Sequence, residues 1–159
     1  MREPASVPAF AEYFGGFPSA SVKQSWGEIA AFYNRDGLLP NGVYFSTVKL
    51  KDGPNDRASQ LDRDASLRWN IGIGRAAYAE AFGAVPKRPA KGMAVDLAVD
   101  FTQRGVLQPH PVYAWMGWVC ICRPTLADLE NYRHLADIAH AHAKEAFARR
   151  FIGEIFKLS

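Results

Sequence analysis

The sequence predicts one α+β domain over residues 1–159, in which a curved antiparallel sheet has helices packed on one side and a long C-terminal helix. Three observations predict this class. Residues 67–73 alternate between apolar and polar side chains, residues 43–51 are rich in strand formers, and small apolar residues recur at steps of three and four after residue 125. Strands followed by a helix with one apolar stripe indicate a sheet covered by helices.

The first half of the chain is predicted to hold one helix and three strands. The helix is short and amphipathic and ends at Gly15-Gly16, and the turn between the second and third strands contains Asn, Asp and Gly. The elements expected are a helix at residues 8–14, strands at 21–24, 28–34 and 43–51, a turn at 34–37, and a polar surface loop with one helical turn at 52–64.

The second half begins with a strand whose two faces differ. Its apolar face is formed by Leu67, Trp69, Ile71 and Ile73, and its other face by Arg68, Asn70 and Gly72. The elements expected next are a helix at 75–82 that stops at Gly83, an exposed loop at 86–92, a helix or loop at 96–107, and a long buried strand at 112–122 that stops at Arg123-Pro124.

The C-terminal helix has the clearest pattern in the chain. Thr125 and Asp128 are spaced as a capping box, with Asp in place of the usual Glu or Gln. Because its buried stripe is mostly alanine, the helix can lie close against a sheet. The residues of this stripe are Leu129, Tyr132, Ala136, Ala139, Ala143 and Ala146 or Phe147.

Composition narrows the functional class only slightly. Apolar residues make up 48% of the chain, which is enough for a core without disulfides or metal. A net charge of +3 without a basic run allows nucleic acid as a partner but does not indicate it. The N-terminus lacks the apolar stretch of a signal peptide and no window could span a membrane, so we expect a cytoplasmic protein with no membrane partner.

Several motifs of metal and cofactor chemistry are absent or out of context. Cys120 and Cys122 point to one strand face with no second pair of ligands, and we expect two reduced core thiols. Residues 72–77 match the dinucleotide pattern G-x-G-x-x-A, but no second parallel strand follows. We therefore expect no metal and no cofactor, and interpret these glycines as a tight strand-to-helix turn whose amides could bind an anion.

Two segments carry the candidate site residues. Arg68 and Asn70 share one strand face, where they either are solvated or hold a carboxylate or phosphate. His110 stands between Pro109 and Pro111, which fix the backbone on both sides. Such a rigid imidazole suits acid–base chemistry or ligand contact, whereas the alternative is a structural histidine bonded to neighbouring backbone.

Aromatic residues and further histidines complete the candidates. Tyr113 and Trp118 follow His110 and could line a pocket with it, although aromatic strands more often form core. The C-terminal helix carries three more histidines without the i, i+4 spacing of a metal-binding pair. Of these we expect His140 near the buried face and His134 and His142 at the surface.

These stretches resemble an uncharacterised bacterial family, the domain of unknown function 6194. The matching segments are Trp26-Gly27-Glu28, residues 68–74, Asp100-Phe101-Thr102, and residues 109–119 with Pro124 and the alanine- and histidine-rich helix. Glu28 stands where the family usually has Asp, and Arg104-Gly105 replaces Leu-Asp. The family is more distantly similar to MmcQ/YjbR-like proteins, a resemblance that implies a small YjbR-like α+β fold, often labelled DNA-binding by structural analogy.

Three functions fit these residues. The first is binding of a small anionic molecule by Arg68, Asn70 and Trp118, with an enzymatic activity assisted by His110 and Tyr113; it requires Arg68 and His110 to converge in one cleft. The second is a nucleic-acid-binding module that uses cations of residues 86–91 and the C-terminal helix. The third is protein interaction or homodimer formation through the apolar tail at residues 151–158. We rank small-molecule binding first.

Overall fold

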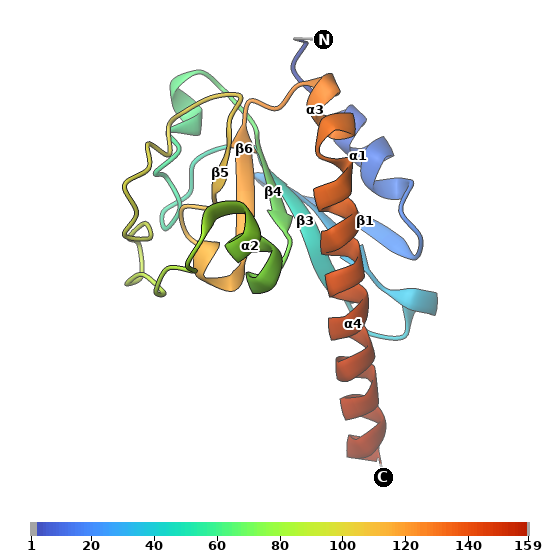
Figure 1. The fold of residues 1–159 in the computed structure, drawn as a ribbon. Helices are drawn as coiled ribbons and strands as arrows, with labels where there is room; N and C mark the ends of the chain where they lie inside the picture. Colours follow the sequence, from blue (N-terminus) through green and yellow to red (C-terminus); the bar gives the residue numbers. More distant parts are fainter. Residues whose placement is uncertain (1–2, 159) are drawn as a thin grey trace.

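The computed structural model describes residues 3–158 and confirms a single α+β domain (Figure 1). The helices and strands, with three short 3-10 helices labelled η, are α1 (Val7–Gly15), β1 (Ala20–Ser25), β2 (Glu28–Tyr33), η1 (Arg35–Gly37), β3 (Val43–Lys49), η2 (Leu61–Arg63), β4 (Arg68–Gly72), α2 (Arg75–Phe82), β5 (Leu107–Pro109), η3 (Ala114–Met116), β6 (Trp118–Cys122), α3 (Leu126–Asn131) and α4 (Arg133–Leu158). The predicted helices at 8–14 and 75–82 and the first four predicted strands are all present, with ends shifted by one or two residues.

The six strands form one antiparallel sheet in the order β1-β2-β3-β4-β6-β5. The strands β1 to β4 follow the chain, and β6 is then placed between β4 and β5. A register shift between Ala31 and Phe32 leaves Phe45 as an extra residue in β3. The side chains of each strand alternate between two faces, so the sheet has one apolar face and one mixed face.

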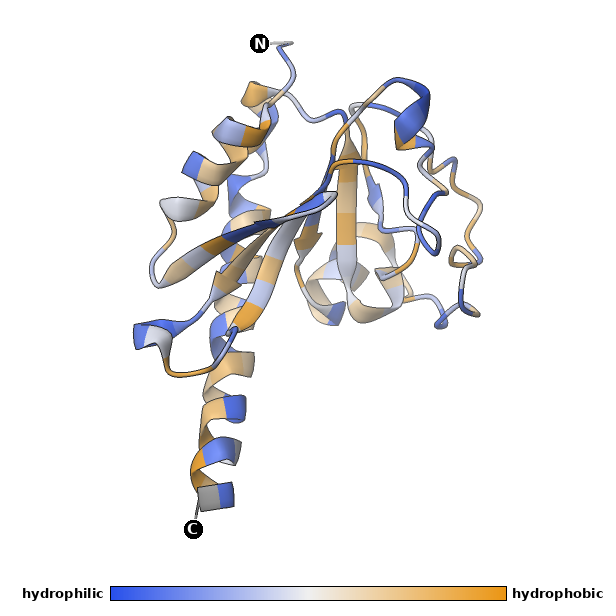
Figure 2. Ribbon diagram, turned by 180° about the vertical axis from the view of Figure 1, so that it is seen from behind, coloured by the Kyte–Doolittle hydropathy of each residue, from blue (hydrophilic) through white to orange (hydrophobic). Residues whose placement is uncertain are grey.

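The apolar face is the hydrophobic core and is covered by α1 and α4 (Figure 1). Trp69 and Ile71 of β4 are fully buried there, and Trp69 packs against Phe10 of α1. The predicted alanine stripe of the last helix is confirmed, because Ala136, Ala139 and Ala143 are buried against the sheet. The C-terminal part of α4 extends past the edge of the sheet (Figure 2), and Arg150 there donates to the Gly42 carbonyl.

The C-terminal helix is divided in two. Thr125 caps α3 as predicted: its hydroxyl accepts from the Asp128 amide, and Asp128 accepts from the Thr125 amide. The helical pattern predicts one continuous element from there, whereas the structure has a break at Tyr132, where the backbone leaves helical geometry before α4 begins. The short α3 then packs against the start of α4.

The long strand predicted at residues 112–122 is wrong in its first half. Only β6, from Trp118 onward, is a strand, and it is preceded by a turn and by η3. Gly117 has φ +86°, and a Cβ there would overlap the backbone of Gly74, so the end of the turn that leads into β6 requires glycine. The ambiguous segment 96–107 is a loop that ends by entering the short strand β5, which the sequence pattern does not predict.

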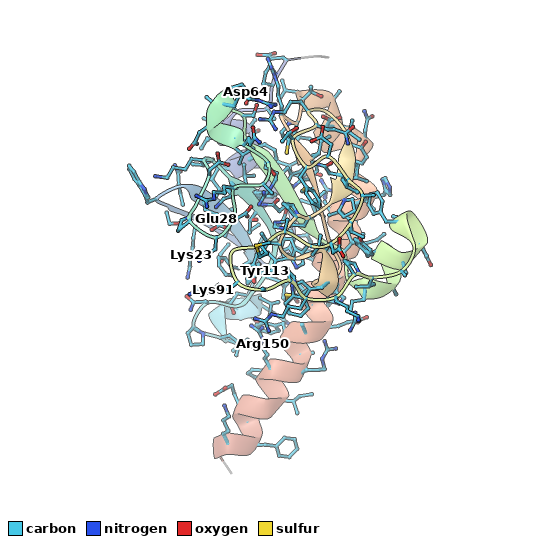
Figure 3. The ribbon with its side chains drawn as sticks, turned by 90° about the vertical axis from the view of Figure 1, so that its left-hand side faces the viewer. Lys23, Glu28, Asp64, Lys91, Tyr113 and Arg150 are labelled. Atoms are coloured by element: carbon cyan, nitrogen blue, oxygen red, sulfur yellow. The ribbon has the colours of Figure 1, made fainter. Side chains whose placement is uncertain are left out.

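The second face of the sheet is covered only in part. A side-chain bond from Gln108 to the Phe101 carbonyl holds the loop after α2 over β5 and β6. The loop between β3 and β4 approaches β4, where Ser59 bonds to Arg68. The part of this face that the two loops leave open extends over β1 to β4 and β6. It is called the pocket face below (Figure 3).

Candidate functional site

The five sequence-predicted site residues all line one pocket of about 490 Å³ on the pocket face. They are Arg68, Asn70, His110, Tyr113 and Trp118. The expected convergence of Arg68 and His110 is confirmed, because Arg68 Nη2 lies 3.1 Å from His110 Nε2. Residues that are 42 positions apart in the chain therefore meet at the floor of one cavity.

Strand alternation places the floor residues. Arg68 and Asn70 lie on the same face of β4, as the sequence predicts, and Trp118 is paired beside them on β6. The alternative of a solvated outer face is wrong, because Arg68 is 1% exposed and Asn70 3%. Asn70 donates to the Thr47 hydroxyl at 3.0 Å, which joins the polar floor of β4 to β3.

Arg68 is held by a carboxylate of the protein itself. Its two terminal nitrogens bind the two oxygens of Asp56 in a bidentate pair, with Nη1 to Oδ1 at 2.9 Å. Nη1 also donates to Ser59 at 2.9 Å, and Nε donates to the Asn70 side chain at 2.8 Å. The guanidinium fork proposed for a ligand is thus occupied by Asp56. The N–H of Nη2 that faces His110 is the one N–H of the group that is not directed at Asp56, Ser59 or Asn70.

The pKa values indicate an ionised pair on this floor. Burial acts to raise the pKa of Asp56, but the hydrogen bonds and positive charge of Arg68 outweigh it and hold this pKa below its usual value. Burial acts to lower the pKa of Arg68, and Asp56 in turn raises it above the usual value. Asp56 and Arg68 are therefore both charged at neutral pH.

Hydrogen bonds within the loop that supplies Asp56, and others from Arg104, fix this loop. Asp52 accepts from the amides of Leu61 and Asp62, and Asp62 accepts from the Asp52 amide. Arg104 donates to the carbonyls of Ser59 and Gln60. Arg104 thus holds a loop of the candidate site.

His110 lies under the pocket with hydrogen-bond donors at both ring nitrogens. Its Nδ1 faces the amides of Val112 and Tyr113, each at 3.0 Å, and its Nε2 faces Arg68. Burial, followed by the positive charge of Arg68, lowers the pKa of His110 well below its usual value, so the ring is neutral at pH 7. The bonds from the Val112 and Tyr113 amides are also those expected if His110 is a structural histidine bonded to neighbouring backbone.

Aromatic rings form one wall of the pocket. The ring of Tyr44 lies between Phe32 and Trp118, with centroid distances of 6.0 and 5.5 Å. Trp118 can lie across β4 because Gly72 has no side chain: a Cβ there would be 2.7 Å from two carbons of the indole. Tyr113, about half exposed, stands at the rim, 5.2 Å from the His110 ring.

Charged side chains of β1, β2 and β3 complete the rim. Lys23, Glu28 and Lys49 line the pocket from β1, β2 and β3, and Lys23 bonds to Asn41 at 2.7 Å. In Figure 3 Lys23 and Glu28 lie on the side of the molecule that also carries Tyr113. No local pattern indicated these residues or Asp56, because strand pairing brings the first three to the site and the folded loop between β3 and β4 brings Asp56.

The other sequence motifs have structural roles. Cys120 and Cys122 are reduced and buried, as predicted, and burial raises the pKa of both thiols. The segment from Gly72 to Gly74 forms the predicted turn from β4 into α2. His140 packs near the buried face, bonded to the Pro18 carbonyl at 2.7 Å, whereas His134 and His142 are exposed, all three as predicted.

Two further features of residues 3–158 are relevant. Within that range, no group of three His, Cys, Asp or Glu side chains is placed to hold a metal ion. None of the helices in the same range is long and apolar enough to cross a membrane.

Fold and site together define a small α+β domain with a polar pocket on the less covered face of its sheet. The chain belongs to the family of unknown function DUF6194, which matches it over residues 6–151. No curated protein and no solved structure matches the chain.

Proposed function

We propose that this protein binds a small organic molecule that carries an anionic group, in the pocket formed by β1 to β4, β6 and the turn after β5. The observation that supports the proposal most is the convergence of Arg68, Asn70 and His110 on the floor of one cavity. The volume, about 490 Å³, is typical of sites for small ligands, which combine an apolar wall with a few fixed polar groups.

The charges of the pocket favour an anion. Three cations line it, Lys23, Lys49 and Arg68, against the two carboxylates of Glu28 and Asp56. Asp56 is neutralised by Arg68, so the rim presents two ammonium groups and one carboxylate. Such a rim attracts anions over the distance of a Debye length, about 8 Å at physiological salt.

The aromatic wall favours a flat or apolar body in the same ligand. Tyr44 and Tyr113 are each about half exposed, while Trp118 is buried behind them. Aromatic faces bury large apolar area at low entropic cost, and they stack on flat groups. A ring or planar chain with one carboxylate or phosphate therefore fits both sides of the pocket.

We keep catalysis by His110 and Tyr113 as a prediction that is secondary to binding. His110 is neutral, and backbone amides already face its Nδ1, which leaves Nε2 as the atom that can contact a ligand. Tyr113 presents its ring at the rim, where it can close over a bound molecule. Our proposal is therefore first a binding site, in which these two residues contact the ligand.

A thermal-shift screen against metabolites and short oligonucleotides tests the proposal, with Lys49→Ala as the test variant. Lys49 lines the pocket, whereas Lys51, whose ammonium lies 3.8 Å over the Trp26 ring, is not among its lining residues. Lys51→Ala is thus a control with the same change of charge. We expect an anionic metabolite to stabilise wild type and Lys51→Ala, and to stabilise Lys49→Ala much less.

The nucleic-acid alternative predicts a different result in the same screen. Oligonucleotides alone would raise the melting temperature, with an effect that falls steeply with salt and responds equally to the two lysine variants. That result would contradict the proposed pocket function and would support the distant resemblance to MmcQ/YjbR-like proteins.

A bacterial origin, a cytoplasmic location and a homodimer formed through residues 151–158 also remain predictions from the sequence.

A further inference from the structure

His110 has more hydrogen-bond donors around it than a neutral imidazole can satisfy. Val112 and Tyr113 direct two backbone N–H groups at Nδ1, and Arg68 directs one N–H group at Nε2. A neutral ring has one nitrogen with a lone pair and one with a proton. One side of His110 therefore places a ring N–H against another donor.

The turn after His110 decides which nitrogen carries the proton. The amides of Val112 and Tyr113 are fixed by that turn, in which the Ala114 amide bonds to the His110 carbonyl at 3.1 Å. A proton on Nδ1 would set two backbone donors, each at 3.0 Å, against it, whereas a proton on Nε2 opposes only one N–H of Arg68. Since each donor left without an acceptor in a partly buried site is costly, the proton belongs on Nε2.

Two N–H groups are then left at the floor of the pocket without an acceptor. One is Nε2–H of His110 and the other is the N–H of Arg68 that faces it, with their nitrogens 3.1 Å apart. The other four N–H groups of Arg68 are directed at Asp56, Ser59 and Asn70. Both residues line the pocket and are at least 98% buried, so the acceptor has to come from the pocket.

We propose that this donor pair is an oxyanion subsite, in which one oxygen of a ligand carboxylate or phosphate accepts from Arg68 Nη2 and His110 Nε2 together. The inference rests on the proposed function and specifies its chemistry. His110 is then a specificity-determining hydrogen-bond donor, and it is not the base of a proton transfer. The subsite rejects ammonium and amidinium groups, because these would bring a third donor to the pair.

Nitrogen NMR of protein labelled with 15N-histidine tests the inference. Long-range 1H–15N spectra distinguish a protonated ring nitrogen from a bare one, and exposed His134 serves as the internal reference. We expect His110 in the free protein to carry its proton on Nε2. Sodium benzoate and inorganic phosphate should each move the Nε2–H signal downfield, and benzamidine, which has the same ring and the opposite charge, should not.

Two variants at His110 supply a second measurement. Glutamine can place an amide N–H near the position of Nε2, whereas leucine fills the space without a donor. We expect His110→Leu to weaken benzoate binding about tenfold or more, and His110→Gln to retain most of the affinity. If His110→Leu does not fold, the wild-type spectra still decide the question.

The possible failures can be told apart. A proton on Nδ1 of the free protein overturns the inference whatever the pocket binds. If benzoate shifts the backbone amide signals of Lys49 and Tyr113 in a second, uniformly 15N-labelled sample but leaves His110 Nε2–H unchanged, the subsite is wrong while the pocket function stands. If neither anion affects His110 or the rim, the subsite is overturned, and the metabolite screen with Lys49→Ala then decides the pocket function.

Discussion

Removing the charge of Asp56 should destabilise the fold far more than an ordinary surface substitution. Asp56→Asn leaves the Arg68 guanidinium, which is 1% exposed, without its counterion. Breaking a buried ion pair by removing one partner typically costs 3–5 kcal/mol; because the Asp56 side chain is 16% exposed and asparagine keeps one acceptor oxygen, we expect about 3 kcal/mol.

Urea unfolding followed by circular dichroism measures this cost. With a slope of about 2 kcal/mol per molar urea for a small domain, a loss of about 3 kcal/mol lowers the midpoint by about 1.5 M. Asp64→Asn in the same loop is the matched control. Its partner Arg104 is 15% exposed and Asp64 31%, so we expect a loss within about 1 kcal/mol.

The effect should also depend on pH in a defined direction. The pKa of Asp56 is lower in the folded than in the unfolded protein, so its ionised form stabilises the fold. That contribution is complete above about pH 4, the ordinary pKa of an aspartate, and is lost as the pH falls through the folded value. If Asp56→Asn costs no more than Asp64→Asn at pH 7, water solvates the Arg68 charge and the buried pair does not exist.

Three further predictions concern other parts of the structure. Gly72→Ala places a methyl group 2.7 Å from the Trp118 ring and should cost about 2 kcal/mol in urea unfolding and weaken ligand binding. Thr125→Ala removes the hydroxyl that caps α3 through the Asp128 amide and should cost about 1 kcal/mol in the same assay. Benzoate affinity should stay constant between pH 6 and 8, because burial and then Arg68 keep His110 neutral throughout that range.

For each of these three predictions, one experimental result would contradict the reasoning. Gly153→Ala adds the same methyl group where nothing lies within 4 Å, so equal destabilisation at positions 72 and 153 would refute the steric argument. An unchanged urea midpoint for Thr125→Ala would show that the cap contributes nothing. A change of affinity centred near pH 6.5 would show that His110 titrates although Arg68, Asp56 and Lys49 surround it.

Local periodicity predicted the parts of the fold that depend on neighbouring residues. The alternation of residues 67–73 placed Arg68 and Asn70 on one face of a strand, because a strand repeats every two residues whatever lies around it. The alanine stripe identified the helix that covers the sheet for the same reason. Neither pattern could show that the polar face of β4 is buried, since that burial comes from a loop elsewhere in the chain.

The features of the fold and of the site that the sequence did not predict depend on contacts between distant residues. Asp56 lies in a polar loop with no periodic pattern, and only the folded loop brings it to Arg68. The segment after His110 resembled a strand because it is apolar and aromatic, and its β-branched and aromatic residues outweighed the turn signal. Gly117 within that segment was the available sign of a reversal, because a glycine inside a predicted strand marks an interruption.

The proposed function and fold stability make different predictions for the polar floor of the pocket. A buried ion pair is often no more stabilising than apolar residues of similar size, and replacing both partners commonly leaves stability equal or higher. We therefore expect the double variant Asp56→Leu/Arg68→Met to be about 2 kcal/mol more stable than Asp56→Asn alone in urea unfolding, because it leaves no unpaired buried charge.

The same double variant should lose the binding of benzoate, because it removes one of the two donors of the subsite while leaving His110 in place. In this variant the side chains of Asn70 and Ser59 each lose the hydrogen bond that Arg68 donates to them. This loss offsets part of the recovery in stability. A double variant that is as unstable as Asp56→Asn would show that the pair is retained for folding. Recovered stability with lost binding would show that the ion pair is held on the sheet for the ligand.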